Sequence, residues 1–236
     1  IRLRQSITSG HHGAIPVADV VILIPVMGRP HHIRPFLSSL YHSTNRARPL
    51  FICNYGDQRV VSVIQREGEE VIFVDTEPGI SGDYARKINA GYHKSKEPLI
   101  FLGATDIKFH VNWLENAERY MTDQIQVVGT NDLGNPDVLK GNHSTHSLLT
   151  RRYADDFGTI DEPNKILCEE YVHEYVDNEF CETAKYRNAW AMAMDSIVEH
   201  MHPAFRKGHW DASYRNLPER LGPSKDTYEN RKHLWT

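Results

Sequence analysis

The sequence predicts an α/β protein with a mostly parallel central sheet flanked by helices. Four short apolar runs, each of a length that suits one strand buried on both faces, recur in the first half of the chain: 18–24, 50–54, 70–75 and 99–102. Turn residues and then apolar residues at helical spacing follow the first three runs. This is the order of strand–helix units in a parallel sheet, and right-handed crossovers bring the loops after the strands to one edge.

The first unit shows the pattern most clearly. Its strand, residues 18–24, reads ADVVILI and ends at Pro25. Pro30 suits the first turn of a helix, and the apolar residues after it recur at helical spacing: Ile33, Phe36, Leu37 and Leu40. The segment therefore predicts a strand, a loop and a helix with one buried face.

The later elements follow from the same criteria. The predicted strands are residues 50–54, 70–75, 99–102, 125–130, 147–150 and 189–194, and the predicted helices are residues 59–67, 83–93, 112–121 and part of 171–190. From His209 onward the chain is polar and rich in Arg, Lys and Asn, so we expect a tail that wraps the body or is partly mobile.

Composition excludes several classes of protein. With 40% apolar and 25% charged residues the chain is an ordinary globular protein, and no apolar run is long enough to span a bilayer. A net charge of −4 gives no global basic field for nucleic acid. Three cysteines without paired spacing fit a reducing compartment, the cytoplasm. Residues 1–17 look like a leader or tag, so we expect one domain over residues 18–236.

An acidic residue follows three of the predicted strands: Asp57, Asp75 and Asp106. Mg²⁺ and Mn²⁺ prefer oxygen ligands and are often held by one or two carboxylates together with the phosphates of a substrate. Asp106 is the best metal candidate, with a helix or turn cap as its alternative role. Asp57 is placed to accept hydrogen bonds from a nucleobase or ribose. The sequence contains neither a Walker lysine loop nor Gly-x-Gly-x-x-Gly, so a nucleotide would bind in another way.

Five motifs, in their order along the chain, resemble the GT-A glycosyltransferases, particularly the family 2-like enzymes of bacteria and phages. They are VVILIPV at 20–26, GDYARKINAG at 82–91, FLGATD at 101–106, YVHEYVDNE at 171–179 and HMHP at 200–203. The likeness covers most of the chain from residue 18 and implies a GT-A-like, Rossmann-like sheet. Of the family's Asp-x-Asp motif only the last carboxylate is kept, as Ala104-Thr105-Asp106.

The resemblance implies that residues 18–110 bind a nucleotide sugar, most simply a UDP-sugar. The residues implied at this site are Pro25, Val26, Arg29, Asp57, Arg86, Lys87 and Asp106. Arg86 and Lys87 would neutralise the diphosphate. Mn²⁺ or Mg²⁺ would be held by Asp106 and, as in several GT-A enzymes, by a late histidine, here His202; the alternative is a surface histidine beside a proline.

Residues 111–236 are implied to bind and activate the acceptor. Asp177 resembles the family's catalytic base, which deprotonates the acceptor hydroxyl as it attacks the anomeric carbon. Glu179 is the competing choice, and capping of a helix is the alternative role of Asp177. The acceptor side is expected to be lined by His143, Thr145, His146 and Glu179. By analogy the hexosyl transfer would be a single displacement with inversion.

The identity of the acceptor stays open at this point. The chain also resembles small phage-encoded glycosyltransferases, some of which modify hydroxymethylated pyrimidines in DNA, and this would place it in the host cytoplasm. A phosphate-contacting face is expected from basic residues of the second half, with solvated surface charge as the alternative. They are Arg151, Arg152, Arg206, Lys207, Arg215, Arg220, Lys225, Arg231 and Lys232. Protein, polysaccharide and small-molecule acceptors also stay open, as does the choice between monomer and dimer.

Two other functions compete with this interpretation. A sugar-phosphate nucleotidyltransferase should carry a Gly-rich phosphate loop with Arg and Lys after the first strand, of which Gly28-Arg29 is a poor version. A non-catalytic carbohydrate- or DNA-binding module on a decayed transferase fold would explain Ala104 in the degenerate motif. The presence of Asp177 and His202 favours the enzyme over this module.

Overall fold

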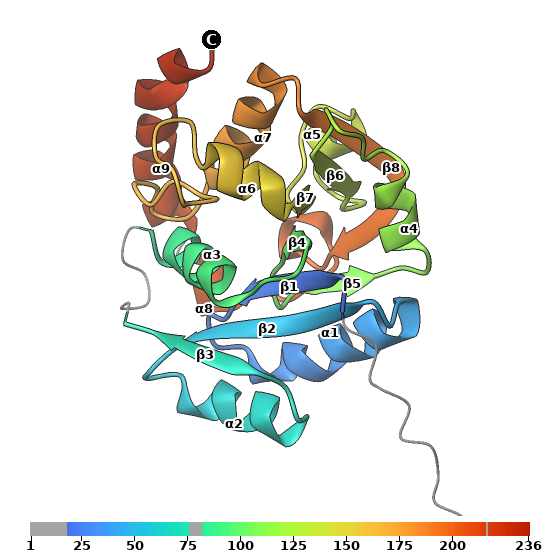
Figure 1. Ribbon diagram of the computed structural model, residues 1–236. Coiled ribbons are helices and arrows are strands. Elements are labelled where there is room, and N and C mark those ends of the chain that lie inside the picture. Colours follow the sequence, from blue (N-terminus) through green and yellow to red (C-terminus); the bar gives the residue numbers. More distant parts are fainter. Residues whose placement is uncertain (1–17, 76–81, 216) are drawn as a thin grey trace, which may run out of the picture.

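The computed structural model describes residues 18–75, 82–215 and 217–236, so the leader-like segment 1–17 and nearly all of the loop at 77–82 lie outside the described residues (Figure 1). The described strands form one eight-stranded sheet. Their bounds are β1 (Val20–Pro25), β2 (Ala47–Asn54), β3 (Val71–Val74), β4 (Leu99–Leu102), β5 (Ile107–Phe109), β6 (Val127–Asn131), β7 (Ser147–Thr150) and β8 (Trp190–His200).

The sheet has the order β3-β2-β1-β4-β7-β6-β8-β5. Strands β1 to β4 are mutually parallel, and β7 and β5 are the two described strands that run in the opposite direction. This confirms the predicted α/β class with a mostly parallel sheet. Because β1, β2 and β4 are parallel and in register, with Leu23 beside Leu102 and Pro25 beside Ile52, their carboxyl ends meet at one edge.

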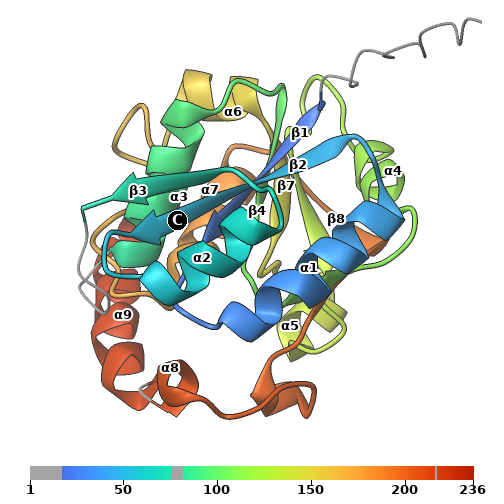
Figure 2. The same cartoon turned by 90° about the horizontal axis from the view of Figure 1, so that it is seen from below.

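Helices cover both faces of this sheet (Figures 1 and 2). The α-helices are α1 (Pro30–Ser43), α2 (Gln58–Arg66), α3 (Asp83–Lys94), α4 (Trp113–Glu118), α5 (Pro136–Leu139), α6 (Arg151–Phe157), α7 (Val176–Tyr186), α8 (Ala212–Arg215) and α9 (Leu217–Arg231), and the 3₁₀ turns are η1 (Pro203–Phe205) and η2 (Lys232–Leu234). None of the described helices has both the length and the hydrophobicity that crossing a bilayer requires.

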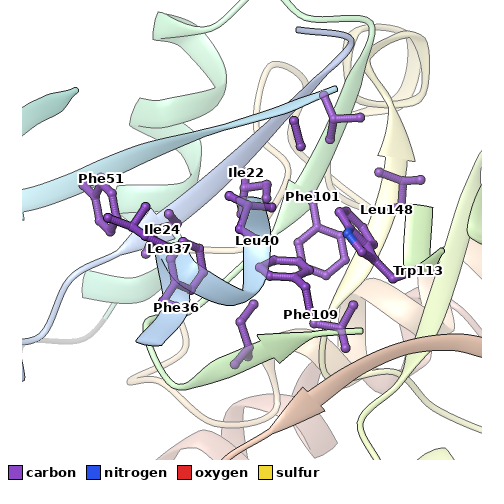
Figure 3. Close-up of a cluster of buried hydrophobic side chains, with 14 of the residues drawn as sticks. Ile22, Ile24, Phe36, Leu37, Leu40, Phe51, Phe101, Phe109, Trp113 and Leu148 are labelled. Atoms are coloured by element: carbon purple, nitrogen blue, oxygen red, sulfur yellow. The ribbon is translucent and has the colours of Figure 1, made fainter. Parts of the chain in front are cut away.

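Two apolar cores lie on the two faces of the sheet, and β1 contributes to both. Ile22 and Ile24 pack with α1, α2 and α4, whereas Val21 and Leu23 pack with α3, α6 and α7. Alternate side chains of a strand point to opposite faces, so a strand covered on both sides must be apolar throughout. Figure 3 shows the first core, where the rings of Phe101, Phe109 and Trp113 meet.

Four elements from β5 onward depart from the expectations. Strand β5 was not expected. Strand β8 runs to His200, whereas the sequence predicted a strand that ends at residue 194. The polar residues of β8 interrupt the apolar pattern, but pairing with β5 and β6 supplies the backbone hydrogen bonds that continue the strand. Helix α7 begins at Val176 rather than near residue 171. The supposed tail is helical as α9, although Pro223 lies inside it and its sequence has little apolar periodicity.

One buried guanidinium holds α9 against the body. Arg231 is 7% exposed and binds both carboxylate oxygens of Glu179, at 2.8 and 2.9 Å, together with Asp161 and Glu170. Glu179 also accepts a hydrogen bond from the Tyr171 hydroxyl at 2.7 Å. The planar fork of arginine suits this multidentate pairing. Glu179 is therefore a structural residue, which corrects the expectation that it contacts the acceptor or competes as the base.

We predict that Arg231→Met lowers the free energy of unfolding by about 3–5 kcal/mol, because it leaves the buried Glu179 carboxylate without its cation. The measurement is urea unfolding followed by circular dichroism. Lys225→Met, an exposed cation on the same helix, is the control and should stay within about 0.5 kcal/mol of wild type. A loss below about 1 kcal/mol in Arg231→Met would show that α9 docks by other contacts.

Candidate active site

A cleft of about 460 Å³ opens at the carboxyl edge of β1 and β4. Parts of the chain that are far apart in sequence line it: the loop after β1, the start of α3, the end of β4, the segments before β7 and α7, the end of β8 and the C-terminal helices. The side chains used below are Pro25, Arg29, Tyr84, Asp106, His143, Thr145, His146, His173, Glu174, Asp177, His200, His202, Tyr214 and Arg220. The cleft thus gathers residues from both halves of the sequence.

Asp106 anchors one end of the cleft. Its Oδ2 accepts hydrogen bonds from Arg29 Nη1, at 2.7 Å, and from the Tyr214 hydroxyl, and His200 Nε2 lies 3.8 Å away. Burial by itself would raise the pKa of Asp106, but His200, Arg29 and Tyr214 outweigh it and hold that pKa well below its usual range. Asp106 is therefore an ionised carboxylate although its side chain is only 6% exposed.

Arg29 connects Asp106 to the C-terminal part of the chain. Its guanidinium binds Asp211 through Nε and Nη2, at 2.6 and 3.1 Å, and lies 4.2 Å from the centre of the Tyr214 ring. Arg29 has a φ of 60°, in the left-handed region that non-glycine residues seldom adopt. Such backbone outliers cluster at functional sites. Two of the five guanidinium N–H groups have no partner among these residues and remain for a ligand.

Two of the histidines near Asp106, His146 and His202, carry their ring hydrogen on different nitrogens. His146 is 3% exposed; its Nδ1 lies 3.0 Å from the Leu102 carbonyl and must donate to it, so Nε2 carries the lone pair, and that buried atom has no partner. His202 accepts the Ala204 amide at Nδ1, which places the ring hydrogen on Nε2. Burial lowers the pKa of each of these two rings to about 4. Both are therefore neutral imidazoles at pH 7.

These side chains are of the types that bind Mn²⁺, namely one carboxylate and neutral or neutralisable imidazoles. Within the described ranges no three His, Cys, Asp or Glu side chains are arranged to hold an ion by themselves. The residues fit an ion held by Asp106 and one imidazole, with a substrate diphosphate supplying the other ligands. His200, which the sequence reasoning did not single out, is the imidazole whose approach to Asp106 is closest to ligand spacing.

Asp177 lies in the same cleft, in the first turn of α7. Its Oδ2 is 3.2 Å from His143 Nε2, and its Oδ1 accepts the Asn178 amide at 3.1 Å. The side chain is 31% exposed, whereas that of His143 is 8% exposed. Burial opposes ionisation of Asp177, but His143 prevails and lowers the pKa of the carboxyl. Thr145 and His143 also line the cleft.

Several predicted donor-site residues lie elsewhere. Lys87 is fully buried, donating to the Val26 carbonyl at 2.7 Å and pairing with Asp83 at 3.0 Å, so it cannot reach a diphosphate in the cleft; this corrects the expectation for Lys87. Val26 contributes a buried side chain to the core. Asp57 and Arg86 do not line the cleft within the described residues, and Arg86 lies 3.7 Å from Glu169.

Several of the cations expected to contact phosphates already bind carboxylates or carbonyls of the protein. Arg151 donates to the carbonyls of Glu97 and Tyr92, and Arg231 is buried in its carboxylate network. Lys207 pairs with Glu199 at 2.8 Å, and Arg220 pairs with Glu174 at 3.0 Å. These four cations are therefore already neutralised or engaged by groups of the protein itself.

A second cavity of about 480 Å³ lies between α1 and β5 and shares only Thr105 and Asp106 with the cleft. Its walls are mostly apolar, with Phe36, Ile107 and Phe109 among them. Asp106 lines both cavities, but Asp177 lines the cleft and not this second cavity. The cleft is accordingly the better candidate for chemistry.

No protein-family model and no curated protein sequence matches this chain. Solved structures do. The match to a mannosyltransferase from Pyrobaculum calidifontis, in complex with GDP-Man and Mn²⁺, covers 94% of this chain and 79% of that one, at 11% identity and a TM-score of 0.56. Glucosyl-3-phosphoglycerate synthase from Mycobacterium tuberculosis, with Mn²⁺, UDP and phosphoglyceric acid, matches over 78% and 71%, at 10% identity and 0.55. The fold is GT-A.

A third GT-A structure, S. aureus TarS 1-349 with UDP, matches over 76% of this chain and 59% of its own, at 13% identity and a TM-score of 0.58. These likenesses confirm the GT-A-like fold that the motifs predicted.

The sequence reasoning did not single out Tyr214, which lines the cleft, or Asp211, which binds Arg29. Both come from the segment expected to be a polar tail. A signal was available, since Tyr214 is an aromatic residue in an otherwise polar stretch. Nothing local could identify its partner, which lies 108 positions earlier in the chain.

We predict a pH-dependent contribution of the Asp177–His143 pair to stability. Burial lowers the pKa of His143, but Asp177 and the Cys181 thiol raise it to about 11 from 6.5, while the pKa of Asp177 falls below 3.8. Because the pKa of His143 is raised, the stabilisation from the charged ring is full below pH 6.5 and is lost as pH rises toward 11. Because the pKa of Asp177 is lowered, the stabilisation from its carboxylate is lost when strong acid protonates it.

Urea unfolding of wild type and Asp177→Asn checks this, because the difference in unfolding free energy between them isolates the pair. The difference should be larger at about pH 6 than at about pH 10. A difference that is equal at both values would mean that the two groups are not coupled.

Proposed function

We propose that this protein is a metal-dependent hexosyltransferase that moves a sugar from a nucleotide sugar, a UDP-sugar by preference, to a hydroxyl acceptor. One observation carries the proposal: a single cleft sets Asp106, at the end of β4, and Asp177, at the start of α7, within the same cavity. One carboxylate would serve the diphosphate side and the other the acceptor side. The GT-A fold supports this division of roles.

The donor would occupy the part of the cleft built by residues 18–110. Pro25, Arg29 and Asp106 line that part, and the two unpartnered N–H groups of Arg29 suit a phosphate oxygen. The structural neighbours were solved with UDP or GDP-Man, and two of them with Mn²⁺. Asp106 with His202 or His200 would hold the ion, and a bound divalent ion would neutralise the leaving diphosphate.

The acceptor would occupy the part built by residues 111–236. Asp177 is ionised and 31% exposed, as a general base must be to take the proton of a hydroxyl. Thr145 and His143 lie beside it in the cleft. The same carboxylate would direct the oxygen at the anomeric carbon in a single displacement with inversion.

The acceptor class is the finer part of the proposal. A hydroxymethylated pyrimidine in phage DNA is the first acceptor to test. The engaged cations Arg151, Arg220 and Arg231 give this acceptor no support. Contacts would have to come from the exposed cations of the expected set, which are Arg152, Arg206, Arg215, Lys225 and Lys232. The three cysteines are buried free thiols, which fits the cytoplasmic location that we propose.

A binding module without catalysis is the second candidate, because Asp106 is already bound by Arg29 and Tyr214. A ligand or ion must displace or share these contacts to reach the carboxylate. Measurement of donor binding and of turnover separates the two candidates.

We predict that UDP binds in a Mn²⁺-dependent manner and that Asp106→Ala weakens this binding at least about tenfold, since one ionic metal contact is lost. Isothermal titration calorimetry with and without Mn²⁺ measures it. Asp123→Ala, an exposed carboxylate outside the cleft, is the control. If neither UDP nor GDP binds under either condition, the transferase proposal is wrong.

We also predict that Asp177→Asn lowers turnover by about 100-fold or more while UDP affinity is unchanged, because an amide cannot take the proton. Release of UDP from UDP-glucose reports turnover without an added acceptor, since water can accept the sugar. Asp137→Asn changes another carboxylate on the rim of the cleft and should retain turnover. Equal turnover in wild type and Asp177→Asn would remove Asp177 from the mechanism.

A further inference from the structure

His143 pairs with one carboxylate of the cleft. Its Nε2 lies 3.2 Å from Asp177 Oδ2, and an ionised carboxylate can only accept, so Nε2 carries a hydrogen. The neighbouring Cys181 thiol donates its own hydrogen to the Ser144 carbonyl, with Sγ 3.4 Å from that oxygen. Burial opposes the charged ring, but Asp177 and Cys181 favour it and raise the pKa of His143 to about 11. The pair is therefore a carboxylate that accepts from an imidazolium.

The two members of the pair differ in their access to the cleft. The side chain of His143 is 8% exposed, and Cys181 is fully buried. Asp177 is 31% exposed and lines the cleft. As an imidazolium, His143 has no lone pair with which to take a proton from a ligand. Of these two side chains only the carboxylate can do so, and His143 acts through it.

We propose that His143 is a positioning residue for Asp177: its Nε2–H fixes the orientation of the carboxylate toward the cleft, and its charge keeps that carboxylate ionised. This inference rests on the proposed function, in which Asp177 is the general base. Together with the Asn178 amide on Oδ1, the contact restrains both oxygens of the carboxylate and leaves lone pairs directed at the acceptor. A base held in this way needs less reorganisation during the reaction.

The other groups around Asp177 do not replace the charge of His143. His173 is neutral, because burial lowers its pKa to about 4. Tyr84 is neutral as well, because burial raises the pKa of its hydroxyl. Glu174 is an acid and supplies no positive charge, and the cation next to it, Arg220, is paired with the Glu174 carboxylate at 3.0 Å. His143 and the backbone amides are therefore the groups that favour the ionised form of Asp177, against burial and Glu174.

The test uses two substitutions with different chemistry. His143→Gln keeps an N–H at the position of Nε2 but removes the charge, whereas His143→Leu removes both. We expect the acidic limb of kcat/KM for UDP release from UDP-glucose to move up by roughly one pH unit in both variants. We expect kcat to fall by roughly 10-fold in His143→Gln and by roughly 100-fold in His143→Leu, within the range for loss of assistance to a general base. UDP affinity should not change.

The matched control is His110→Gln. His110 Nε2 also pairs with a carboxylate, Glu199 Oε2 at 3.0 Å, but neither residue lines the cleft. This variant should keep the wild-type pH profile. Circular dichroism and urea unfolding identify any variant that fails to fold. If folded His143→Gln and His143→Leu keep the wild-type acidic limb and kcat, His143 is only a packing residue and the proposal is overturned.

A second measurement separates this proposal from the proposed function. If wild type releases no UDP from any donor, the transferase proposal fails, and ¹⁵N NMR of the histidine rings still tests the pair. We expect the His143 ring to stay an imidazolium above about pH 8 in wild type and to lose its proton below about pH 8 in Asp177→Asn, because burial is then opposed less strongly. A neutral His143 ring at pH 7 in wild type would overturn the inference.

Discussion

The carboxylate of Asp106 is the group on which the architecture of the cleft depends. It joins the end of β4 to the loop after β1 through Arg29, to the end of β8 through His200, and to α8 through Tyr214. Four segments far apart in the sequence thus meet at one oxygen atom. A buried anion is tolerated only with such compensation. The same contacts that stabilise it also define what a donor or an ion must share or displace.

Charge in the cleft is organised as pairs of opposite sign. Asp106 lies against Arg29, Asp177 against His143, and Glu174 against Arg220. Each pair joins an acid to a base from another part of the chain, so the cleft has little uncompensated charge before a ligand enters. A nucleotide diphosphate with a divalent ion would therefore exchange contacts with these paired groups rather than bind at a region of uncompensated charge. This arrangement also limits the number of free cations for a nucleic-acid backbone.

The GT-A fold persists here at 10–13% identity to the neighbouring structures and with a degenerate Asp-x-Asp motif. In this chain the ends of the parallel strands β1, β2 and β4 meet at one edge of the sheet. Asp106 lies at that edge because β4 pairs with β1 in register. Gly103 allows this closeness: a Cβ there would come within 2.9 Å of Ile22 Cγ2.

The sequence by itself determined β1 to β4 and the buried faces of α1 and α2, because apolar periodicity and strand ends are local patterns. The same patterns put Asp106 after β4, whereas only the resemblance to a family motif pointed to Asp177. The sequence could not determine β5, the docking of α9, or the roles of Lys87 and Glu179. Those depend on partners that are distant in the chain, such as Val26 for Lys87 and Arg231 for Glu179. A charged side chain looks the same in sequence whether it meets water, a ligand or a buried counterion. Only the tertiary structure decides which, because hydrogen bonds and ion pairs act through space over a few ångströms.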